Sequence, residues 1–194
     1  DIDDQKKKEW ELREKSQKDS LTGLLNNSTI KQQIGARLQS LKRGQTGYLV
    51  VQDVDSFKKI NDTNGHLFGD AVLCSFADEL SNIFPEALKG RIGGDEFVFY
   101  VEDMDREQLE EKLKQLNRCM SDRYDDDKTG LHISCSLGAA VTDGTVTDYN
   151  MLFQWADAAL YQVKSKGKGA YYLLDVKEGV ALPGKSYLDS EENK

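Results

Sequence analysis

The sequence contains few cysteines and prolines and no long apolar run. Its three cysteines, Cys74, Cys119 and Cys135, are odd in number and lack the spacing of a metal site, which excludes a disulfide scaffold and favours a reducing compartment. The mean hydropathy is -0.63 and no apolar segment approaches the length of a bilayer span, so we expect no transmembrane helix. The first residues do not resemble a secretory signal peptide.

Basic residues are in the minority. Lysine and arginine number 26 against 34 aspartates and glutamates, which gives a formal net charge of -8. Because such a surface repels phosphate backbones, we expect no nucleic-acid partner. An anionic substrate would need metal ions or a few well-placed lysines. The 194 residues suit one domain, and 16 glycines with only 2 prolines are typical of a globular chain.

Apolar periodicity predicts helices and strands that follow one another along the chain. The expected helices lie at 30–41, 73–83, 109–120 and 152–163, with a short helical turn at 56–62, and the expected strands lie at 48–51, 91–92, 97–101, 132–141 and 170–174. Asn27 and Ser28 are candidate caps for the first of these helices. The Gly93-Gly94 pair can adopt the positive φ of a tight hairpin turn. This order predicts an α/β sandwich with helices packed on a central sheet.

Carboxylates gather where two of the expected strands end. Asp53 directly follows the strand around 48–52 and Asp55 comes two residues later, while Asp95 and Glu96 sit at the hairpin turn. Such carboxylates can converge on a hard cation, and two cations a few Å apart are a known device for in-line phosphoryl or nucleotidyl transfer. Any one of these acids taken alone is more often a solvated turn residue. The four together, beside glycines, favour a site.

The segment 57–66 is the next candidate for binding chemistry. It supplies lysine ammonium groups and backbone amides just beyond the acidic strand end, which suits a triphosphate, although a plain surface loop has the same composition. Phe57 and His66, at its two ends, are included as substrate-binding candidates. His66 and His132 share no metal-like spacing with each other or with the cysteines, which disfavours zinc.

Four blocks of sequence resemble a known family. Arg91 and the Gly93-Gly94-Asp95-Glu96-Phe97 run are similar to the signature of the GGDEF family of diguanylate cyclases. The other blocks resemble the family's opening segment, nucleotide-binding stretch and closing helix: DSLTGLLN at 19–26, DVDSFKKINDTNGHLFGD at 53–70 and ADAALYQVKSKG at 156–167. They fall in the family's order, and the similarity runs from about Asp19 to Leu174.

The resemblance implies a fold and an activity. The implied fold class is α/β (α+β), a central mixed or antiparallel sheet flanked by helices as in class III nucleotidyl cyclases and polymerase palms. The implied reaction condenses two GTP molecules into cyclic di-GMP and releases two pyrophosphates, with two Mg²⁺ (or Mn²⁺) ions per active site. Each protomer of a homodimer binds one GTP, and each 3′-hydroxyl attacks the other nucleotide's α-phosphate.

The same resemblance implies how the chain is organised. Residues 19–175 form the GGDEF domain, 1–18 a charged helical lead-in from an upstream sensory module, and 176–194 a polar tail. Such a domain is expected in the cytoplasm, where GTP is, without direct membrane contact. Whether the parent protein is membrane-anchored is left open.

Carried over position by position, the resemblance also implies residue roles. Asp53 and Asp95 resemble the side-chain metal ligands, assisted by the Val54 carbonyl. Glu96 is implied to deprotonate or position the 3′-hydroxyl, and Lys58 completes the catalytic set. The implied nucleotide contacts are Asn61 and Asp70 with guanine, Lys58, Lys164 and Lys168 with phosphates, and Gly93 and Gly94 with the nucleotide at close range.

The sequence departs from the family pattern in a few places. Lys168 stands where arginine is usual, Gly169 where asparagine is usual and Val163 where alanine is often found. Many members also carry an R-x-x-D product-inhibition motif, whose two positions here are Phe84 and Ala87. Neither side chain can make the required polar contacts, so we expect no such inhibitory site.

Two other readings stay open. One is a catalytically silent GGDEF domain that senses GTP or cyclic di-GMP, against which the intact acids at Asp53, Asp95 and Glu96 weigh. The other is a metal-dependent nuclease or polymerase-like transferase, which the negative charge and the lack of an aromatic-basic groove disfavour.

Overall fold

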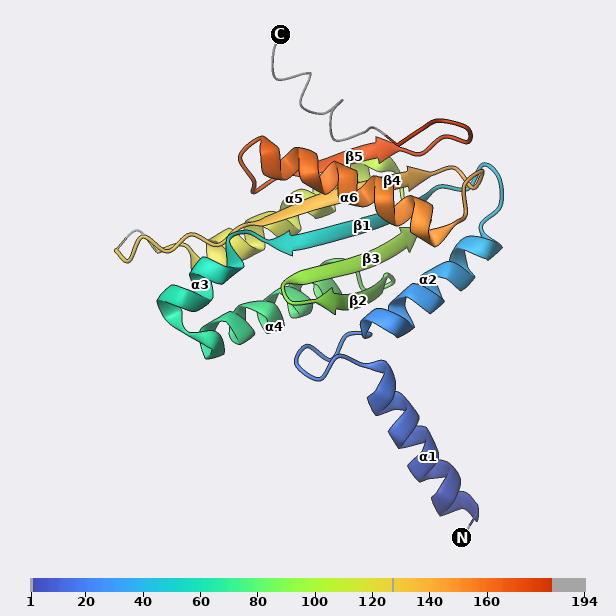
Figure 1. Ribbon diagram of the computed structural model, residues 1–194, viewed down its shortest axis with the longest axis horizontal. Helices are drawn as coiled ribbons and strands as arrows, with labels where there is room; N and C mark the ends of the chain where they lie inside the picture. The colour runs from blue at the N-terminus through green and yellow to red at the C-terminus, as the bar shows by residue number, and fades with distance from the viewer. Residues whose placement is uncertain (1, 127, 183–194) are drawn as a thin grey trace.

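A mixed β-sheet forms the centre of the molecule. The computed structural model describes residues 2–126 and 128–182, without the side chains of residues 9–15. Within these residues the five strands lie in the order β2-β3-β1-β4-β5 (Figure 1). Each described pair is antiparallel except β4 with β5, which is parallel. The strands are β1 (Gly47–Val54), β2 (Leu88–Gly93), β3 (Glu96–Glu102), β4 (Cys135–Thr142) and β5 (Tyr171–Asp175).

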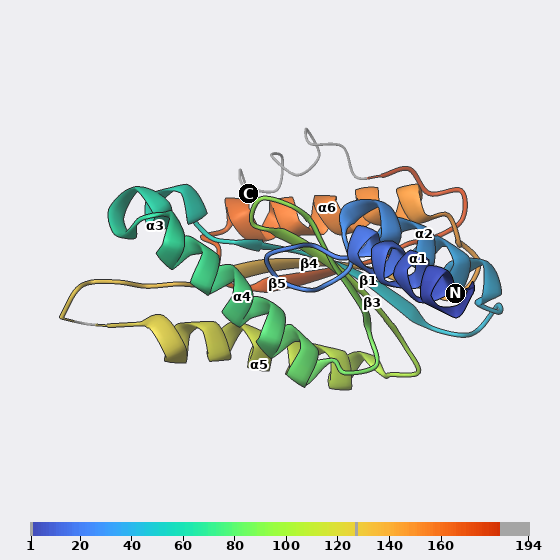
Figure 2. The same ribbon diagram turned by 90° about the horizontal axis from the view of Figure 1, so that it is seen from below.

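Helices cover both faces of this sheet. α2 and α6 pack on one face and α4 and α5 on the other, as Figure 2 shows. α3 follows the end of β1, and α1 extends away from the sheet (Figure 1). The helices are α1 (Ile2–Gln17), α2 (Asn27–Ser40), α3 (Phe57–Asn64), α4 (His66–Ile83), α5 (Arg106–Tyr124) and α6 (Tyr149–Ser165). The predicted α/β class, a mixed sheet flanked by helices, is confirmed.

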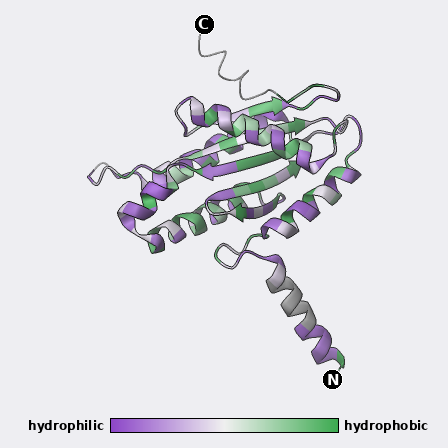
Figure 3. Ribbon diagram, viewed as in Figure 1, coloured by the Kyte–Doolittle hydropathy of each residue, from purple (hydrophilic) through white to green (hydrophobic). Residues whose placement is uncertain are grey.

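β1 is buried on both faces because it lies in the middle of the sheet. Successive side chains of a strand point to opposite faces. Tyr48 and Val50 therefore join the core beneath α4 and α5, whereas Leu49 and Val51 join the core beneath α2 and α6. The centre of the sheet is hydrophobic, and the end of β1 beside α3 is hydrophilic (Figure 3). Polar groups therefore collect at that end.

The expected start of the first core helix is wrong by one or two residues. Asn26, not Asn27 or Ser28, caps α2, because its side chain accepts a hydrogen bond from the Thr29 amide at 3.0 Å. The expected strand at 132–141 also starts later, at Cys135.

The cause of that later start is local hydrogen bonding. The Ile133 amide donates to the Asp125 carboxylate at 3.1 Å and not to a neighbouring strand. The expected hairpin forms between β2 and β3, and of the glycine pair at its turn Gly94 has the positive φ, of 33°. Among the described residues, no helix has both the length and the apolar character needed to cross a membrane.

The close approach of α6 to β4 depends on one glycine. A Cβ on Gly138 would collide with the Ala156 carbonyl oxygen and the Leu160 amide nitrogen, and would lie 2.7 Å from the Leu160 Cα. These atoms belong to the backbone of α6, so they can move only if the helix moves with them. Gly138 therefore fixes how near α6 lies to the sheet.

We expect Gly138→Ala to lower the free energy of unfolding by about 3 kcal/mol, because overpacking displaces α6. The matched control is Gly35→Ala in α2, where a Cβ meets nothing within 4 Å. That variant should gain about 0.5–1 kcal/mol from the higher helix propensity of alanine. Urea unfolding of both variants checks the pair. Equal stability of Gly138→Ala and the wild type would contradict the packing argument.

Candidate active site

The ends of β1 and of the β2–β3 hairpin bring the predicted carboxylates together. Asp53 pairs in register with Glu96 across β1 and β3, and the Val54 amide donates to the Asp95 carbonyl at 3.3 Å. Asp53 is only 8% exposed, while Asp95 is half-buried and Glu96 exposed. Three carboxylates from two segments about 40 residues apart in sequence thus lie at one end of the sheet.

Asp53 has one oxygen paired and one oxygen free. Its Oδ2 forms an ion pair with the Lys164 ammonium group from the last turn of α6. Its Oδ1 is buried and has no hydrogen-bond partner. A buried carboxylate oxygen left without a partner is costly, so this atom is suited to a ligand that carries positive charge.

The ionisable groups around Asp53 have shifted pKa values. Burial raises the pKa of Asp95, against the opposing charge of Arg91. Burial also raises the pKa of Glu96, helped by the negative charges of Asp95 and Asp157. Burial and then the neighbouring Lys168 lower the pKa of Lys164. The site therefore concentrates negative charge in a poorly solvated place, which favours a cation.

These residues fit a magnesium ion that shares its coordination with a substrate. Within the described residues, no three histidine, cysteine, aspartate or glutamate side chains come together as a ready-made metal site. Mg²⁺ is usually bound through one or two carboxylates, waters and substrate phosphates. The free Oδ1 of Asp53 and the neighbouring Asp95 supply such a partial set.

Asp55 does not join this carboxylate group. Its Oδ1 accepts a hydrogen bond from the Ser136 hydroxyl at 2.6 Å. Its Oδ2 accepts from the Ser134 hydroxyl at 2.6 Å and from the Gly169 amide at 3.0 Å. Because both oxygens are taken by protein donors, the expectation that Asp55 converges on a cation with the other acids is wrong.

The predicted guanine contacts lie where α3 meets α4. The Asn61 Oδ1 is buried and has no hydrogen-bond partner. A Cβ on Gly69 would fall on that same oxygen and 3.1 Å from the Phe57 ring, so Gly69 lets α4 approach Asn61 closely. Asp70 follows Gly69 and is partly buried. The junction of α3 and α4 thus carries a free amide oxygen and, in the residue after Gly69, a carboxylate.

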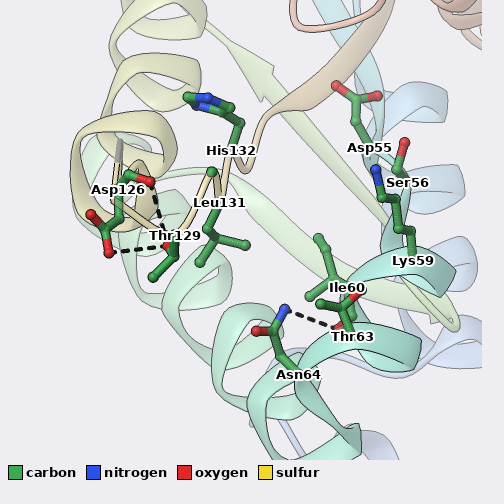
Figure 4. Close-up of a pocket in the computed structure, with 11 residues that line it drawn as sticks. Asp55, Ser56, Lys59, Ile60, Thr63, Asn64, Asp126, Thr129, Leu131 and His132 are labelled. Atoms are coloured by element: carbon green, nitrogen blue, oxygen red, sulfur yellow. Dashed lines mark hydrogen bonds between the residues drawn. The ribbon is translucent and has the colours of Figure 1, made fainter.

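α3 presents two different faces. Phe57, Lys58 and Asn61 share one side by helical periodicity. The opposite side lines a cavity of about 460 Å³ with the segment that precedes β4 (Figure 4). The residues that line it from α3 are Lys59, Ile60, Thr63 and Asn64. His66, at the start of α4, is exposed and is not among the residues lining this cavity.

The predicted phosphate contacts lie at the turns after β1 and after α6. The Lys168 ammonium group donates to the Ser56 hydroxyl at 3.2 Å. Both residues have a positive φ, 67° for Lys168 and 56° for Ser56, which is rare for residues other than glycine. Lys164 lies in the last turn of α6, four residues before Lys168, and pairs with Asp53. The structure therefore brings Lys164 and Lys168 to the acidic end of the sheet.

Arg91 ties the hairpin to the N-terminal turn. Its Nε donates to the Gly94 carbonyl at 2.8 Å, and its guanidinium group lies 3.2 Å from both carboxylate oxygens of Asp19. Burial by itself would raise the pKa of Asp19, but hydrogen bonds from Thr22 and Arg91 outweigh it and lower that pKa. Both residues stand in recognisable motif blocks, but no pattern in the sequence predicts this contact.

The position expected for an inhibitory arginine belongs to the core. Phe84 is 2% exposed, and its ring centroid lies 4.8 Å from that of Phe99. Its carbonyl oxygen accepts a hydrogen bond from the Lys89 ammonium group at 2.9 Å. Ala87 is partly buried and its amide donates to the Phe84 carbonyl. Neither Phe84 nor Ala87 therefore offers a polar side-chain group for recognition of a nucleotide.

A family model described as "Diguanylate cyclase, GGDEF domain" matches residues 16–170. The chain therefore belongs to the GGDEF family of diguanylate cyclase domains. The structure of the coiled coil and GGDEF domain of DgcB from Caulobacter crescentus matches with a TM-score of 0.81 at 24% identity, covering 89% of this chain and 93% of that one. That similarity confirms the GGDEF fold.

Relatives in the family carry different names. Diguanylate cyclase DgcS of Shewanella oneidensis is 35% identical over 80% of this chain and 52% of its own length. Cyclic di-GMP phosphodiesterase PdeR of Escherichia coli is 29% identical over 88% of this chain and 26% of its own length. The chain spans about half or less of these proteins, which contain further regions outside the match.

We expect Gly69→Ala to weaken binding of a non-hydrolysable GTP analogue about tenfold, because the added methyl displaces the buried Asn61 amide oxygen from its position. The displaced atom is the end of a side chain, so the fold should tolerate the change. Calorimetric titration with the GTP and ATP analogues measures affinity and base selectivity, and Gly35→Ala serves as the control. Unchanged affinity and selectivity would show that Asn61 does not read the base.

We also expect cyclic di-GMP to bind only in competition with GTP, because Phe84 is part of the core and the turn lacks an arginine. Calorimetric titration of cyclic di-GMP should give no binding heat once a non-hydrolysable GTP analogue saturates the domain. Tight product binding that the analogue does not diminish would reveal an inhibitory surface elsewhere.

Proposed function

We propose that this domain is a metal-dependent diguanylate cyclase that condenses two GTP molecules into cyclic di-GMP and releases two pyrophosphates. The observation that carries the proposal is the buried, unpartnered Oδ1 of Asp53 beside Asp95. Two lysines that could contact phosphates stand next to these acids. Membership in a family with named diguanylate cyclases such as DgcS supports the same activity.

The metal would be held by the Asp53 and Asp95 carboxylates with the Val54 carbonyl. When bound, Mg²⁺ or Mn²⁺ would neutralise charge on the phosphates during in-line displacement, with two ions proposed per site. Lys164 pairs with Asp53 in the structure. When the nucleotide binds, Lys164 would donate its hydrogen bond to a phosphate oxygen instead. Lys58 and Lys168 would add further positive charge for the phosphates.

Glu96 is the proposed proton acceptor at the 3′-hydroxyl. A carboxylate whose pKa is raised holds a proton more strongly than an ordinary glutamate, which suits general-base work. The 3′-oxygen forms a bond to the α-phosphorus of the opposing nucleotide, the proton passes toward Glu96, and pyrophosphate leaves. Since one chain carries one set of these residues, the reaction requires a homodimer with two sites face to face.

Guanine is proposed to lie between α3 and α4. The Asn61 Oδ1 and the Asp70 carboxylate would accept the N1–H and exocyclic amine hydrogen bonds of the base. A site built to bond a base's N–H groups rejects a base that lacks them, because its acceptors are then left unpaired. Adenine nucleotides should therefore bind poorly.

α1 is proposed to connect the domain to an upstream sensory module. The relatives are longer than this chain, with only 52% of DgcS and 26% of PdeR covered. The Arg91–Asp19 ion pair links the segment just after α1 to the catalytic hairpin. The domain itself is proposed to work in the cytoplasm.

A domain that binds nucleotides without turning them over is the second candidate. The similarity to PdeR, which is named a phosphodiesterase, favours it, because a GGDEF domain in such a protein need not synthesise cyclic di-GMP. Binding of the GTP analogue without any product in a dimeric sample would identify this case.

We expect Asp53→Ala to reduce cyclic di-GMP formation at least about a hundredfold, since it removes a group that binds the charge-neutralising ions. The assay incubates the domain with GTP and Mg²⁺ and separates products by chromatography. Asp122→Ala, which removes an exposed carboxylate from α5, is the matched control and should keep full activity. Turnover by Asp53→Ala near that of the wild type would overturn the mechanism.

A further inference from the structure

Asp55 is an internal hydrogen-bond acceptor that joins three segments of the chain. It is 7% exposed, and it accepts from Ser134 and Ser136, which flank the start of β4, and from the Gly169 amide after α6. Bonds to an ionised carboxylate are shorter and stronger than neutral ones, and the two hydroxyl contacts here are 2.6 Å long. Asp55 is therefore a fixed point in the structure.

The segment that Asp55 holds is the turn carrying Lys168. The Gly169 amide is shared between the Asp55 carboxylate and the Ser136 hydroxyl, at 3.0 and 3.2 Å. Lys168 and Gly169 both have positive φ values, 67° and 65°. A left-handed lysine persists only where its surroundings impose it. Its own amide donates to the Val163 carbonyl at 3.0 Å, and the two bonds to Gly169 hold the residue that follows it.

Ser56, the residue after Asp55, contacts the Lys168 side chain directly. Ser56 also has a positive φ, of 56°, and its hydroxyl accepts a hydrogen bond from the Lys168 ammonium group at 3.2 Å. Asp55 thus fixes the backbone on both sides of the contact between Ser56 and Lys168. The exposed Lys168 side chain therefore reaches the turn between β1 and α3, where Ser56 lies.

We infer that Asp55 is a positioning residue: with Ser134 and Ser136 it sets the turn after α6 so that the Lys168 ammonium group faces the nucleotide phosphates. This inference rests on the proposed function, because that function places phosphates beside Lys168. Asp55 acts through Lys168, because each of its carboxylate oxygens already accepts a hydrogen bond from a protein donor.

The test is a double-mutant cycle on nucleotide affinity. The Kd of a non-hydrolysable GTP analogue with Mg²⁺ is measured for the wild type, Asp55→Ala, Lys168→Ala and the double variant. Each single change should raise the Kd about tenfold, the loss typical of one charge-assisted hydrogen bond. The double variant should be no weaker than Lys168→Ala by more than about twofold, because residues that act through one contact are not additive.

Two further variants separate positioning from general destabilisation. Asp55→Asn keeps the shape and one acceptor oxygen, so its Kd should lie between those of the wild type and Asp55→Ala, and it replaces the alanine variant if that protein does not fold. Asp105→Ala removes the capping box of α5, far from Lys168 along the sheet. It should lower the melting temperature without changing the Kd.

The outcomes distinguish this inference from the proposed function. If the wild type binds the analogue and a folded Asp55→Ala or Asp55→Asn variant binds equally well, the inference fails and the proposed function stands. Additive losses in the double variant also overturn it, since Asp55 would then act independently of Lys168. If the wild type neither binds the analogue nor forms product, the proposed function fails and the inference with it.

Discussion

The pairing of β1 with both β3 and β4 is the constraint on which the site depends. β1 is hydrogen-bonded along its length to two antiparallel neighbours, with Asp53 opposite Glu96 on one side and Ser136 on the other. Side chains alternate along a strand, so this register sends Asp53 to the α6 face, where Lys164 lies. A slip of one residue would put the buried Gln52 there instead.

Two glycines then set the distances across the site. Gly138 lets α6 lie against β4, which brings Lys164 within reach of Asp53, and Gly69 lets α4 lie against Asn61. Both contacts need a residue without a Cβ, so packing and site geometry are not independent. The resulting arrangement leaves one buried oxygen each of Asp53 and Asn61 without a hydrogen-bond partner, which costs stability. A bound ligand would supply the missing hydrogen bonds or charge.

Local patterns predicted most of the elements and part of the site. Apolar spacing identified α4, α5 and α6 because each buries one stripe, and motif positions placed Asp53 and Asp95 at strand ends. The partners of Asp55 could not be found in this way. Ser134 and Ser136 lie about 80 residues further on and belong to no motif, so only the register of β4 against β1 reveals them.

The same limit explains why Asp55 was grouped with the wrong acids. From sequence, Asp53 and Asp55 are equivalent strand-end carboxylates on the same side of an alternating pattern. The strand ends at Val54, so the alternation that governs Asp53 no longer governs Asp55. What decides the role of each is the donor that reaches it: a lysine side chain for Asp53, and two hydroxyls with a backbone amide for Asp55.

Charge balance gives the reason why such a site would recruit cations in an acidic protein. The net charge of -8 acts weakly at the site, because ionic screening limits it to about 8–10 Å at physiological salt. The local balance decides: in the proposed complex Asp53, Asp95 and Glu96 would face a triphosphate that is itself negative, and Lys164 and Lys168 could not offset both. Divalent ions held by the carboxylates would supply the positive charge that such a complex needs.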